Sequence, residues 1–382
     1  MISFSKKFIF YSPGDRIYEI HLRREQFEIP RAFARNGYDS ILVSGLINVP
    51  QDEEISFFQT NHLFFNPLRI IIEFGEVIRR FRKEKPDVVM IYHNNPLIPL
   101  FVFSYMILDY LYKDKEKKKV VWLLKSDWLE SRKLGQHLFD RLVRVMGIFV
   151  NQLFFRYILV ETPCAIRSLS RFIPDKKLIL SSNFFPSSLT YSNKYENGKR
   201  EHTLLTVAQI LRQKGIHIML NAFSRLSSQF PDWKVHIVGP VQDIEYYKEL
   251  QEIVKANRLE SQVSFLGPLY GDSLKEEYFT ASIFCLPSIY ESFGIVRYEA
   301  AIAGIPVITS NAGCGEYLSQ LCMLVYKYDR IDELTELLSN LMISEAFRIK
   351  VSSNQQENLR DLKGSISEFI GLLDGKSNED FE

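Results

Sequence analysis

The chain has 382 residues, 46% of them hydrophobic, and its 47 lysines and arginines nearly balance its 46 aspartates and glutamates. This length exceeds what one hydrophobic core usually supports, so two domains are expected. The net charge of +1 excludes a strongly basic nucleic-acid binder, and we expect no nucleic-acid partner.

The near-neutral total hides a charge asymmetry between the two halves. Residues 1–185 carry 28 basic and 20 acidic side chains, a net charge of +8, whereas the remainder carries −7. The opening residues, MISFSKKFIFYSP, predict a first strand that ends near Pro13 rather than a signal peptide. The four cysteines show no CxxC spacing and are not typical of a disulfide framework, so a cytoplasmic location is expected.

Short apolar runs alternate with helical stretches through the first half of the chain. The predicted strands are KFIFYS (7–12), SILVSG (40–45), VVMIYH (88–93), KVVWLLK (119–125) and YILVET (157–162). A helix through 32–36 is predicted between the first two of them. Strands that alternate with helices predict a parallel sheet covered by helices on both faces.

Two apolar stretches of the first half suggest contact with a membrane surface. The stretch 96–112 is short for a transmembrane helix and contains Asp109, so a buried or interfacial helix is expected. Residues 132–159 interleave basic and apolar side chains, as a helix lying on anionic lipid does. An ordinary amphipathic helix with a solvated basic face stays an open alternative for this second stretch.

Residues 178–202 lose the alternation and gather Ser, Asn, Pro and Lys, which predicts a linker. The alternation then resumes. The predicted strands are TLLTVAQI (203–210), KVHIVGP (234–240), VSFLGP (263–268), SIFCLPS (282–288) and IPVITS (305–310). A helix is expected over 216–230, and further helices are expected after the last of these strands. We therefore expect domains at 1–185 and 186–382, with packing of the final helices back onto the first domain left open. Ligands of such sheets bind beyond the carboxyl ends of the strands.

Glu291 and Glu299 lie eight positions apart across a predicted helix that begins at Phe293-Gly294. At the rise of an α-helix this separation is at most about 12 Å along the axis, the length scale of a sugar diphosphonucleoside. A helix start presents unpaired amides and partial positive charge, which suit a diphosphate.

This arrangement predicts a donor site with a role for each position. Glu291 is expected to hold sugar hydroxyls and Glu299 the ribose, while Phe293, Gly294 and Ile295 form the donor-binding helix start. A surface helix with two solvated acids is the alternative that the spacing alone leaves open.

The segment LPSIYESFGIVRYEAAIAGIPVITSNAGCGEYL (286–318) resembles the signature region of family 4 retaining glycosyltransferases. TVAQILRQKGIHIMLNAF (206–223), VHIVGP and VSFLGPL are similar to other landmarks of the same family, in the same order. The resemblance implies a GT-B architecture, with two Rossmann-like domains facing across a cleft. It also implies transfer of a hexose from a nucleotide sugar with retained configuration, without a metal ion or a cofactor beyond the UDP- or GDP-linked donor.

The resemblance assigns further residues of the second domain. Lys214 falls on the diphosphate-binding lysine, and an ammonium group suits a departing nucleoside diphosphate. The family often has an arginine five residues earlier, where this chain has Gln209, and Arg212 is a candidate substitute or an outward-pointing charge. Gly239 either lets the backbone pass close to the nucleotide or is a plain turn glycine.

The first domain offers three further candidate residues, each with a structural alternative. Gly14 in FYSPGDR is expected to contact the acceptor or the donor phosphate, or to form a simple Pro-Gly turn. Asp127, beside Lys125, is expected to orient the acceptor hydroxyl or take its proton, unless it only caps a helix. His93 at a strand end has a substrate role or is a hydrogen-bonded loop histidine.

The sequence thus predicts a glycosyltransferase that extends a glycan or lipid-linked acceptor in cell-surface polysaccharide biosynthesis, peripheral to the inner membrane face. A nucleotide-sugar epimerase-like enzyme and a catalytically silent subunit that binds a partner transferase are the alternatives. Many members of the resembling family carry a histidine after a later front-domain strand, and the corresponding stretch KVVWLLKSDW (119–128) has none. This absence and Gln209 motivate the silent subunit.

Overall fold

The computed structural model divides the chain into two compact units. The first unit contains Met1–Trp128, Arg132–Pro186 and Gly364–Glu382, and the second contains Leu129–Ser131 and Ser187–Lys363. The structure describes residues 6–18, 25–60, 67–92, 98–111, 120–126, 153–181, 200–291, 293–360 and 365–375.

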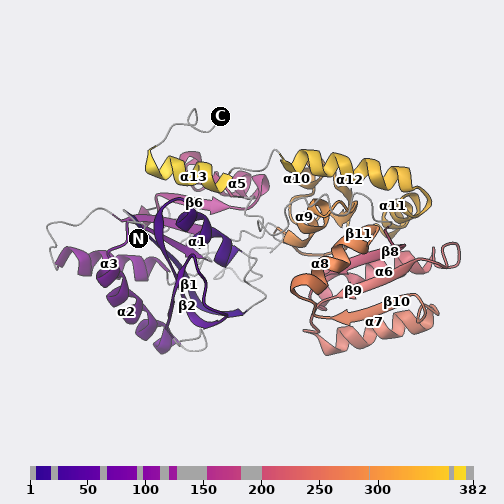
Figure 1. Ribbon diagram of the computed structural model, residues 1–382, viewed down its shortest axis with the longest axis horizontal. Helices are drawn as coiled ribbons and strands as arrows, with labels where there is room; N and C mark the ends of the chain where they lie inside the picture. Colours follow the sequence, from indigo (N-terminus) through magenta and orange to yellow (C-terminus); the bar gives the residue numbers. More distant parts are fainter. Residues whose placement is uncertain are drawn as a thin grey trace. The chain divides into compact units, whose positions relative to one another are not determined.

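The first unit is built on a parallel sheet of seven strands (Figure 1), in the order β3-β2-β1-β4-β5-β6-β7. The strands are β1 (Lys6–Tyr18), β2 (Tyr38–Asn48), β3 (Ser56–Gln59), β4 (Val88–Tyr92), β5 (Val121–Ser126), β6 (Tyr157–Val160) and β7 (Leu178–Leu180). All five strands predicted for this half are confirmed, and the expected parallel pairing is present.

Three expectations for this sheet need correction. Residues 178–180 form the edge strand β7, so the segment predicted as a linker from residue 178 begins inside the sheet. The edge strand β3 was not predicted. Strand β1 does not end near Pro13 but continues to Tyr18, with a shift of its register against β2 between Ser12 and Arg16.

Helices cover both faces of this sheet, as the alternation of strands and helices predicts. They are α1 (Glu25–Arg35), α2 (Pro67–Glu84), α3 (Ile98–Leu111), α5 (Pro163–Leu169) and α13 (Ser365–Asp374). Successive side chains of a strand point to opposite faces. Accordingly Ile9 and Tyr11 belong to a cluster with residues of α2, α3 and α5, whereas Phe8 and Phe10 pack in a cluster with residues of α1 and α13.

Helix α13, drawn in yellow in Figure 1, completes the core of the first unit from the far end of the sequence. Phe369 and Ile370 are buried in the cluster that contains Phe8. The carboxylate of Asp374 accepts a hydrogen bond of 2.6 Å from the Tyr38 hydroxyl and pairs with Lys6. Residues more than 360 positions apart thus share one core, and 365–375 group with the first unit, which is the alternative left open for the final helices.

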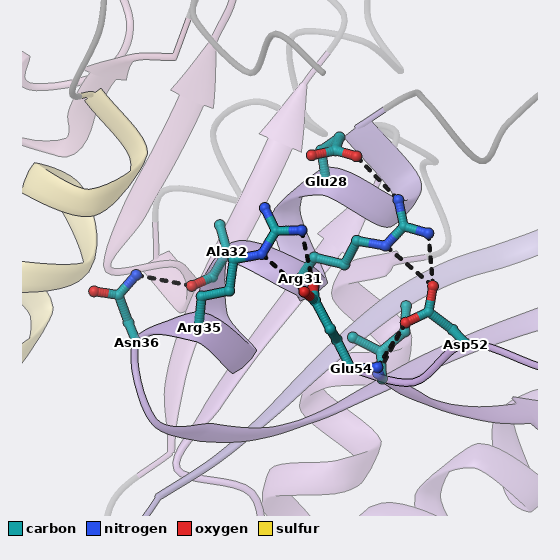
Figure 2. Close-up of polar contacts among 8 residues, drawn as sticks. Glu28, Arg31, Ala32, Arg35, Asn36, Asp52 and Glu54 are labelled. Carbon is teal, nitrogen blue, oxygen red and sulfur yellow. Dashed lines mark hydrogen bonds and ion pairs between the residues drawn. The ribbon is translucent and has the colours of Figure 1, made fainter. Parts of the chain in front are cut away.

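Ion pairs fasten α1 to the segment that follows β2 (Figure 2). Arg31 donates to Asp52 from Nε at 3.0 Å and from Nη2 at 2.6 Å, and its Nη1 pairs with Glu28. One turn later Arg35 pairs with Glu54. A guanidinium that engages a carboxylate with two nitrogens is geometrically specific, so these contacts fix how α1 lies on the sheet.

The second unit has a parallel sheet of six strands in the order β10-β9-β8-β11-β12-β13. Its strands are β8 (Thr203–Val207), β9 (Lys234–Val238), β10 (Val263–Gly267), β11 (Ile283–Leu286), β12 (Val307–Ser310) and β13 (Leu324–Tyr326). The five predicted strands are confirmed. The expectation of helices alone after the strand at 305–310 is wrong, because β13 forms the edge beyond β12.

Seven helices are described in this unit: α6 (Ile216–Ser224), α7 (Ile244–Ala256), α8 (Gly271–Thr280), α9 (Ile295–Ile302), α10 (Gly315–Gln320), α11 (Ile331–Ile343) and α12 (Glu345–Arg360). The helix expected over 216–230 is shorter than predicted and ends at Ser224. The helix expected from Phe293-Gly294 is confirmed as α9, with Gly294 at its N-cap.

The two stretches with membrane character have different outcomes. Residues 98–111 form the helix α3, whose Phe101 and Val102 are buried while Phe103, Met106 and Ile107 are between 41% and 49% exposed. Most of 132–159 lies outside the described residues, and its end is the strand β6 rather than a helix. Within the described parts of the chain, no helix has the length and apolar character to cross a membrane.

Candidate functional site

The order of strands locates the ligand-binding edge of the second sheet. β8 lies between β9 and β11, so the direction in which successive strands are added reverses at the pair β8–β11. In parallel sheets, ligands bind beyond the carboxyl ends of the strands at such a reversal. The loop after β8 carries Lys214, and the loop after β11 carries Glu291. The topology therefore brings together two side chains that the sequence separates by 77 positions.

Lys214 and Glu291 form an ion pair at this edge. The ammonium Nζ of Lys214 donates to Oε2 of Glu291 at 2.7 Å, and the Ser288 hydroxyl donates to the same oxygen at 3.2 Å. The loops themselves are joined, because the amides of Ile289 and Tyr290 donate to the carbonyl of Gln213 at 2.8 and 3.3 Å. The side chain of Lys214 is 17% exposed and that of Glu291 is 9% exposed, so the lysine keeps access to solvent.

The carboxyl of Glu291 is held in its ionised form. Burial raises its pKa, but the charges of Lys214 and Arg297 and the hydrogen bonds from Lys214 and Ser288 outweigh burial. The pKa of Glu291 is therefore below its ordinary value. An ammonium has three N–H donors, so Lys214 can bind an anion while it stays bonded to Glu291.

Helix α9 begins beside this ion pair. Gly294 has φ +66°, a left-handed conformation that favours glycine, and it is the N-cap from which Ile295 starts the helix. The ring of Phe293 stacks on that of Tyr298, with centroids 4.3 Å apart, and is buried. Phe293 thus anchors the helix start through packing. The first amides of a helix have no intrahelical partners and can bind an anion.

Arg297 is a functional candidate that the sequence interpretation missed. It lies on α9, is fully buried, and donates to the Thr309 hydroxyl at 3.0 Å and to the carbonyl oxygens of Ala312 and Phe293 at 2.9 and 2.8 Å. Phe293, Arg297, Ala300 and Ala301 are all buried. An arginine placed on the apolar face of a helix is the signal that could have identified it.

The other predicted donor residues have neighbours of their own. Glu299 accepts a hydrogen bond of 2.8 Å from the hydroxyl of Tyr278 in α8. Arg212 is paired with Glu249 of α7 and lies over the ring of Tyr246, so its guanidinium is engaged at the surface. This arrangement matches the outward-pointing alternative for Arg212.

Gly239 lies where the loops after β8 and β9 meet. A β-carbon at this position would lie 1.9 Å from the carbonyl oxygen of Ala208, and the φ of +147° is one that side chains rarely allow. The glycine lets the two loops approach, since the Ala208 amide donates to the carbonyl of Val238 at 2.9 Å. The close approach of the two loops accounts for the glycine, and its role near a nucleotide stays a prediction.

The predicted residues of the first unit are less fully described. Asp127 and His93 lie outside the described residues. Gly14 lies within β1 at the register shift, not in a turn that ends the strand. Lys125, at the end of β5, is fully buried and donates to Glu161, which follows β6, at 3.2 Å. No group of three metal-ligating side chains that could hold an ion occurs in the described ranges.

Comparisons with known proteins find similar sequences among glycosyltransferases. Residues 188–358 match the family Glycosyl transferases group 1. An uncharacterized glycosyltransferase of Haemophilus influenzae is 24% identical over 360 residues, which cover 92% of this chain and 95% of the relative. An uncharacterized glycosyltransferase of Methanocaldococcus jannaschii is 34% identical over 113 residues, which cover 30% of this chain and 28% of the relative.

Solved structures extend the likeness to both units. The structure of HepE of Anabaena in complex with UDP and glucose has a TM-score of 0.75 at 15% sequence identity. The likeness covers 97% of this chain and 100% of HepE. WaaG, a glycosyltransferase involved in lipopolysaccharide biosynthesis, has a TM-score of 0.71 at 15% identity over 96% of this chain and 100% of its own. The likeness shows that the chain has the GT-B fold.

Proposed function

From the GT-B fold and the match of residues 188–358 to Glycosyl transferases group 1, we propose that this protein is a family 4 glycosyltransferase that transfers a hexose with retained configuration. The observation that carries the proposal is the Lys214–Glu291 pair beside the start of α9. It offers a cation and free helix amides where a sugar diphosphonucleoside would need them.

The donor is proposed to be a UDP- or GDP-linked sugar bound as a substrate, with no metal ion and no further cofactor. Its diphosphate would rest on the amides of α9 and on the free N–H donors of Lys214. Glu291 would orient Lys214 and accept from sugar hydroxyls, and Glu299 would accept from the ribose. That HepE of Anabaena is known in complex with UDP and glucose supports this choice of donor class.

Transfer is proposed to occur on one face of the sugar. The acceptor oxygen forms a bond to the anomeric carbon as the bond from that carbon to the diphosphate oxygen breaks. The proton of the acceptor hydroxyl passes to the departing diphosphate, whose negative charge Lys214 and the helix amides stabilise. Asp127 would orient the acceptor hydroxyl, with Gly14 and His93 as further candidates for acceptor contact.

Binding and product analysis test this proposal. In thermal-shift measurements one of UDP, GDP and ADP should raise the melting temperature of the protein, because a ligand that binds only the folded state stabilises it. Lys214→Met should lose this shift, and the matched control Lys248→Met, on the exposed face of α7, should keep it. Absence of any shift with all three diphosphates would reject the donor site.

The acceptor is proposed to be a glycan or lipid-linked glycan of a cell-surface polysaccharide, met by a protein peripheral to the inner membrane face. The basic first half and the exposed Phe103, Met106 and Ile107 of α3 support this part. Flotation with anionic phosphatidylglycerol vesicles at low salt tests it. Met106→Glu should reduce co-flotation, while Ile343→Glu, at a more exposed apolar site of the second unit, should not.

Two alternative functions can be distinguished from the proposed transfer by the products that each would form. An epimerase-like enzyme would convert the nucleotide sugar without an acceptor, and a silent subunit would bind nucleoside diphosphates without turnover. Mass spectrometry after incubation with a panel of nucleotide sugars and glycan acceptors distinguishes the three. Neutral Gln209, where the resembling family often has arginine, favours the silent subunit.

A further inference from the structure

The buried guanidinium of Arg297 has neutral hydrogen-bond partners. Its Nη atoms donate to the hydroxyl of Thr309 and to the main-chain carbonyls of Ala312 and Phe293. Burial lowers the pKa of Arg297, and the nearby Glu291 opposes that effect. Because the guanidinium group is effectively always protonated in proteins, a full positive charge lies beneath the start of α9.

The described charges around this point do not cancel. Lys214 and Arg297 bring two positive charges, and Glu291 brings one negative charge whose hydrogen bonds go to Lys214 and Ser288. A buried charge without a counter-ion is costly. The start of α9 adds partial positive charge rather than compensating for it. This group of residues is therefore suited to receive an anion.

The position of the surplus charge is defined by Gly294. The Nε of Arg297 is buried and has no hydrogen-bond partner among the described residues. A β-carbon at residue 294 would lie 2.6 Å from that Nε and 2.6 Å from Nη2. The guanidinium is thus covered at this point by the bare backbone of the α9 N-cap, and its field acts on whatever binds there.

We propose that Arg297 is a positioning residue that makes the subsite at the start of α9 net positive and so selects a diphosphate over an uncharged ligand. The proposal rests on the proposed function and deepens it. The charge would act from behind the backbone, without touching the ligand. With neutral Gln209 in the loop after β8, Arg297 would supply from α9 the cation that this loop position lacks.

The test compares charged and uncharged probes on purified full-length protein. Isothermal titration calorimetry with inorganic pyrophosphate, UDP and uridine is expected to show that Arg297→Met weakens pyrophosphate and UDP at least tenfold. Binding of uridine should change less than twofold. Arg297→Lys should restore most of the affinity for pyrophosphate, and Arg297→Gln, which keeps donors but not the charge, should not.

Arg200→Met is the matched control, because Arg200 is a second largely buried arginine of the same unit. Its guanidinium donates to the carbonyls of Phe279, Ala281 and Ala303 at 2.7–3.1 Å, and burial lowers its pKa to about 10. Its role is to cap the ends of α8 and α9. Arg200→Met should lower the melting temperature without a selective loss of pyrophosphate.

The outcomes separate the two levels of the proposal. Equal losses for uridine and UDP in Arg297→Met, or equal affinities of the Lys and Gln variants for pyrophosphate, would show a purely structural arginine and overturn the inference. Wild-type affinities in all Arg297 variants would overturn it too, while leaving the donor site intact. Failure of the unaltered protein to bind pyrophosphate and every nucleoside diphosphate would reject the proposed function itself. Should Arg297→Met not fold, the Lys and Gln pair alone decides.

Discussion

Each unit of the protein has a Lys–Glu pair at the carboxyl ends of parallel strands, and the two pairs differ in their access to solvent. In the first unit Lys125 is 0% and Glu161 11% exposed, and the charges lie 3.2 Å apart. In the second unit Lys214 is 17% and Glu291 9% exposed, with the charges 2.7 Å apart. In the first pair the lysine is sealed, and in the second it is open.

This difference indicates different uses for the same chemistry. An anion from solvent could reach the fully buried Lys125 only by losing its own hydration. We therefore interpret the Lys125–Glu161 pair as a structural link between β5 and β6. The open lysine faces solvent beside an unpaired helix start and can take a second anionic partner. The four predictions below test this interpretation, starting with the largest expected effect.

Lys125→Met should destabilise the first unit by about 3–5 kcal/mol, because it removes the fully buried ammonium that pairs with the Glu161 carboxylate. The melting temperature is the measurement. Lys214→Met should cost far less stability, since Glu291 keeps the Ser288 hydroxyl and the charge of Arg297. Replacing both partners, as Lys125→Met with Glu161→Leu, should recover most of the loss. An equal decrease in melting temperature for Lys125→Met and Lys214→Met would contradict the comparison.

Lys214→Met should instead lower kcat/KM for donor-dependent transfer about 10²–10³-fold, which is roughly 3–4 kcal/mol of lost transition-state stabilisation. The measurement is release of nucleoside diphosphate in the presence of a competent acceptor. The exposed Lys248→Met serves as the control and should retain full activity. An unchanged rate in Lys214→Met would show that the open pair is not part of the reaction.

Gly294→Ala should destabilise the second unit by roughly 1–3 kcal/mol, because alanine is strained at the left-handed φ of this position and its β-carbon collides with the Arg297 guanidinium. Gly271→Ala is the matched control, with φ +56° but nothing within 4 Å of the added carbon. The difference between the two melting temperatures isolates the collision. Equal melting temperatures for the two variants would contradict the close packing of Arg297 against residue 294.

The smallest effect is a pH dependence of stability from Glu291. Its pKa is lower in the folded protein than in the unfolded chain, so its contribution is present above the ordinary glutamate pKa and is lost as pH falls through the folded-state value. The urea midpoint should therefore fall less steeply on acidification in Glu291→Gln than in the unaltered protein. A steeper fall in the variant would reverse the assigned sign.

The sequence predicted the central strands of both sheets but missed three edge strands. β3, β7 and β13 have four, three and three residues, and each pairs with a neighbour on one side only. The existence of such a short strand at a sheet edge depends on the neighbour that it joins. The linker expected from residue 178 shows the consequence, because Leu178–Leu180 is held by β6 rather than by its own composition.

The site was predicted where the chemistry is local in sequence. The helix start at Gly294 and the assignment of Lys214 and Glu291 followed from motifs, and the structure brings that lysine and glutamate together. The partner of Arg212 depends on α7, and two hydrogen-bond partners of Arg297 come from β12 and the turn after it, which no local pattern reports. The roles of these residues toward a donor stay predictions.

Helix α13 has a consequence for how this protein is made. The core around Phe8 stays open until Phe369 and Ile370 leave the ribosome, after every residue of the second unit has been synthesised. At about 5–20 residues per second, the roughly 180 intervening residues take on the order of ten to forty seconds. The unit that begins first is thus finished last, and its unsealed sheet face is the surface that a chaperone would have reason to cover.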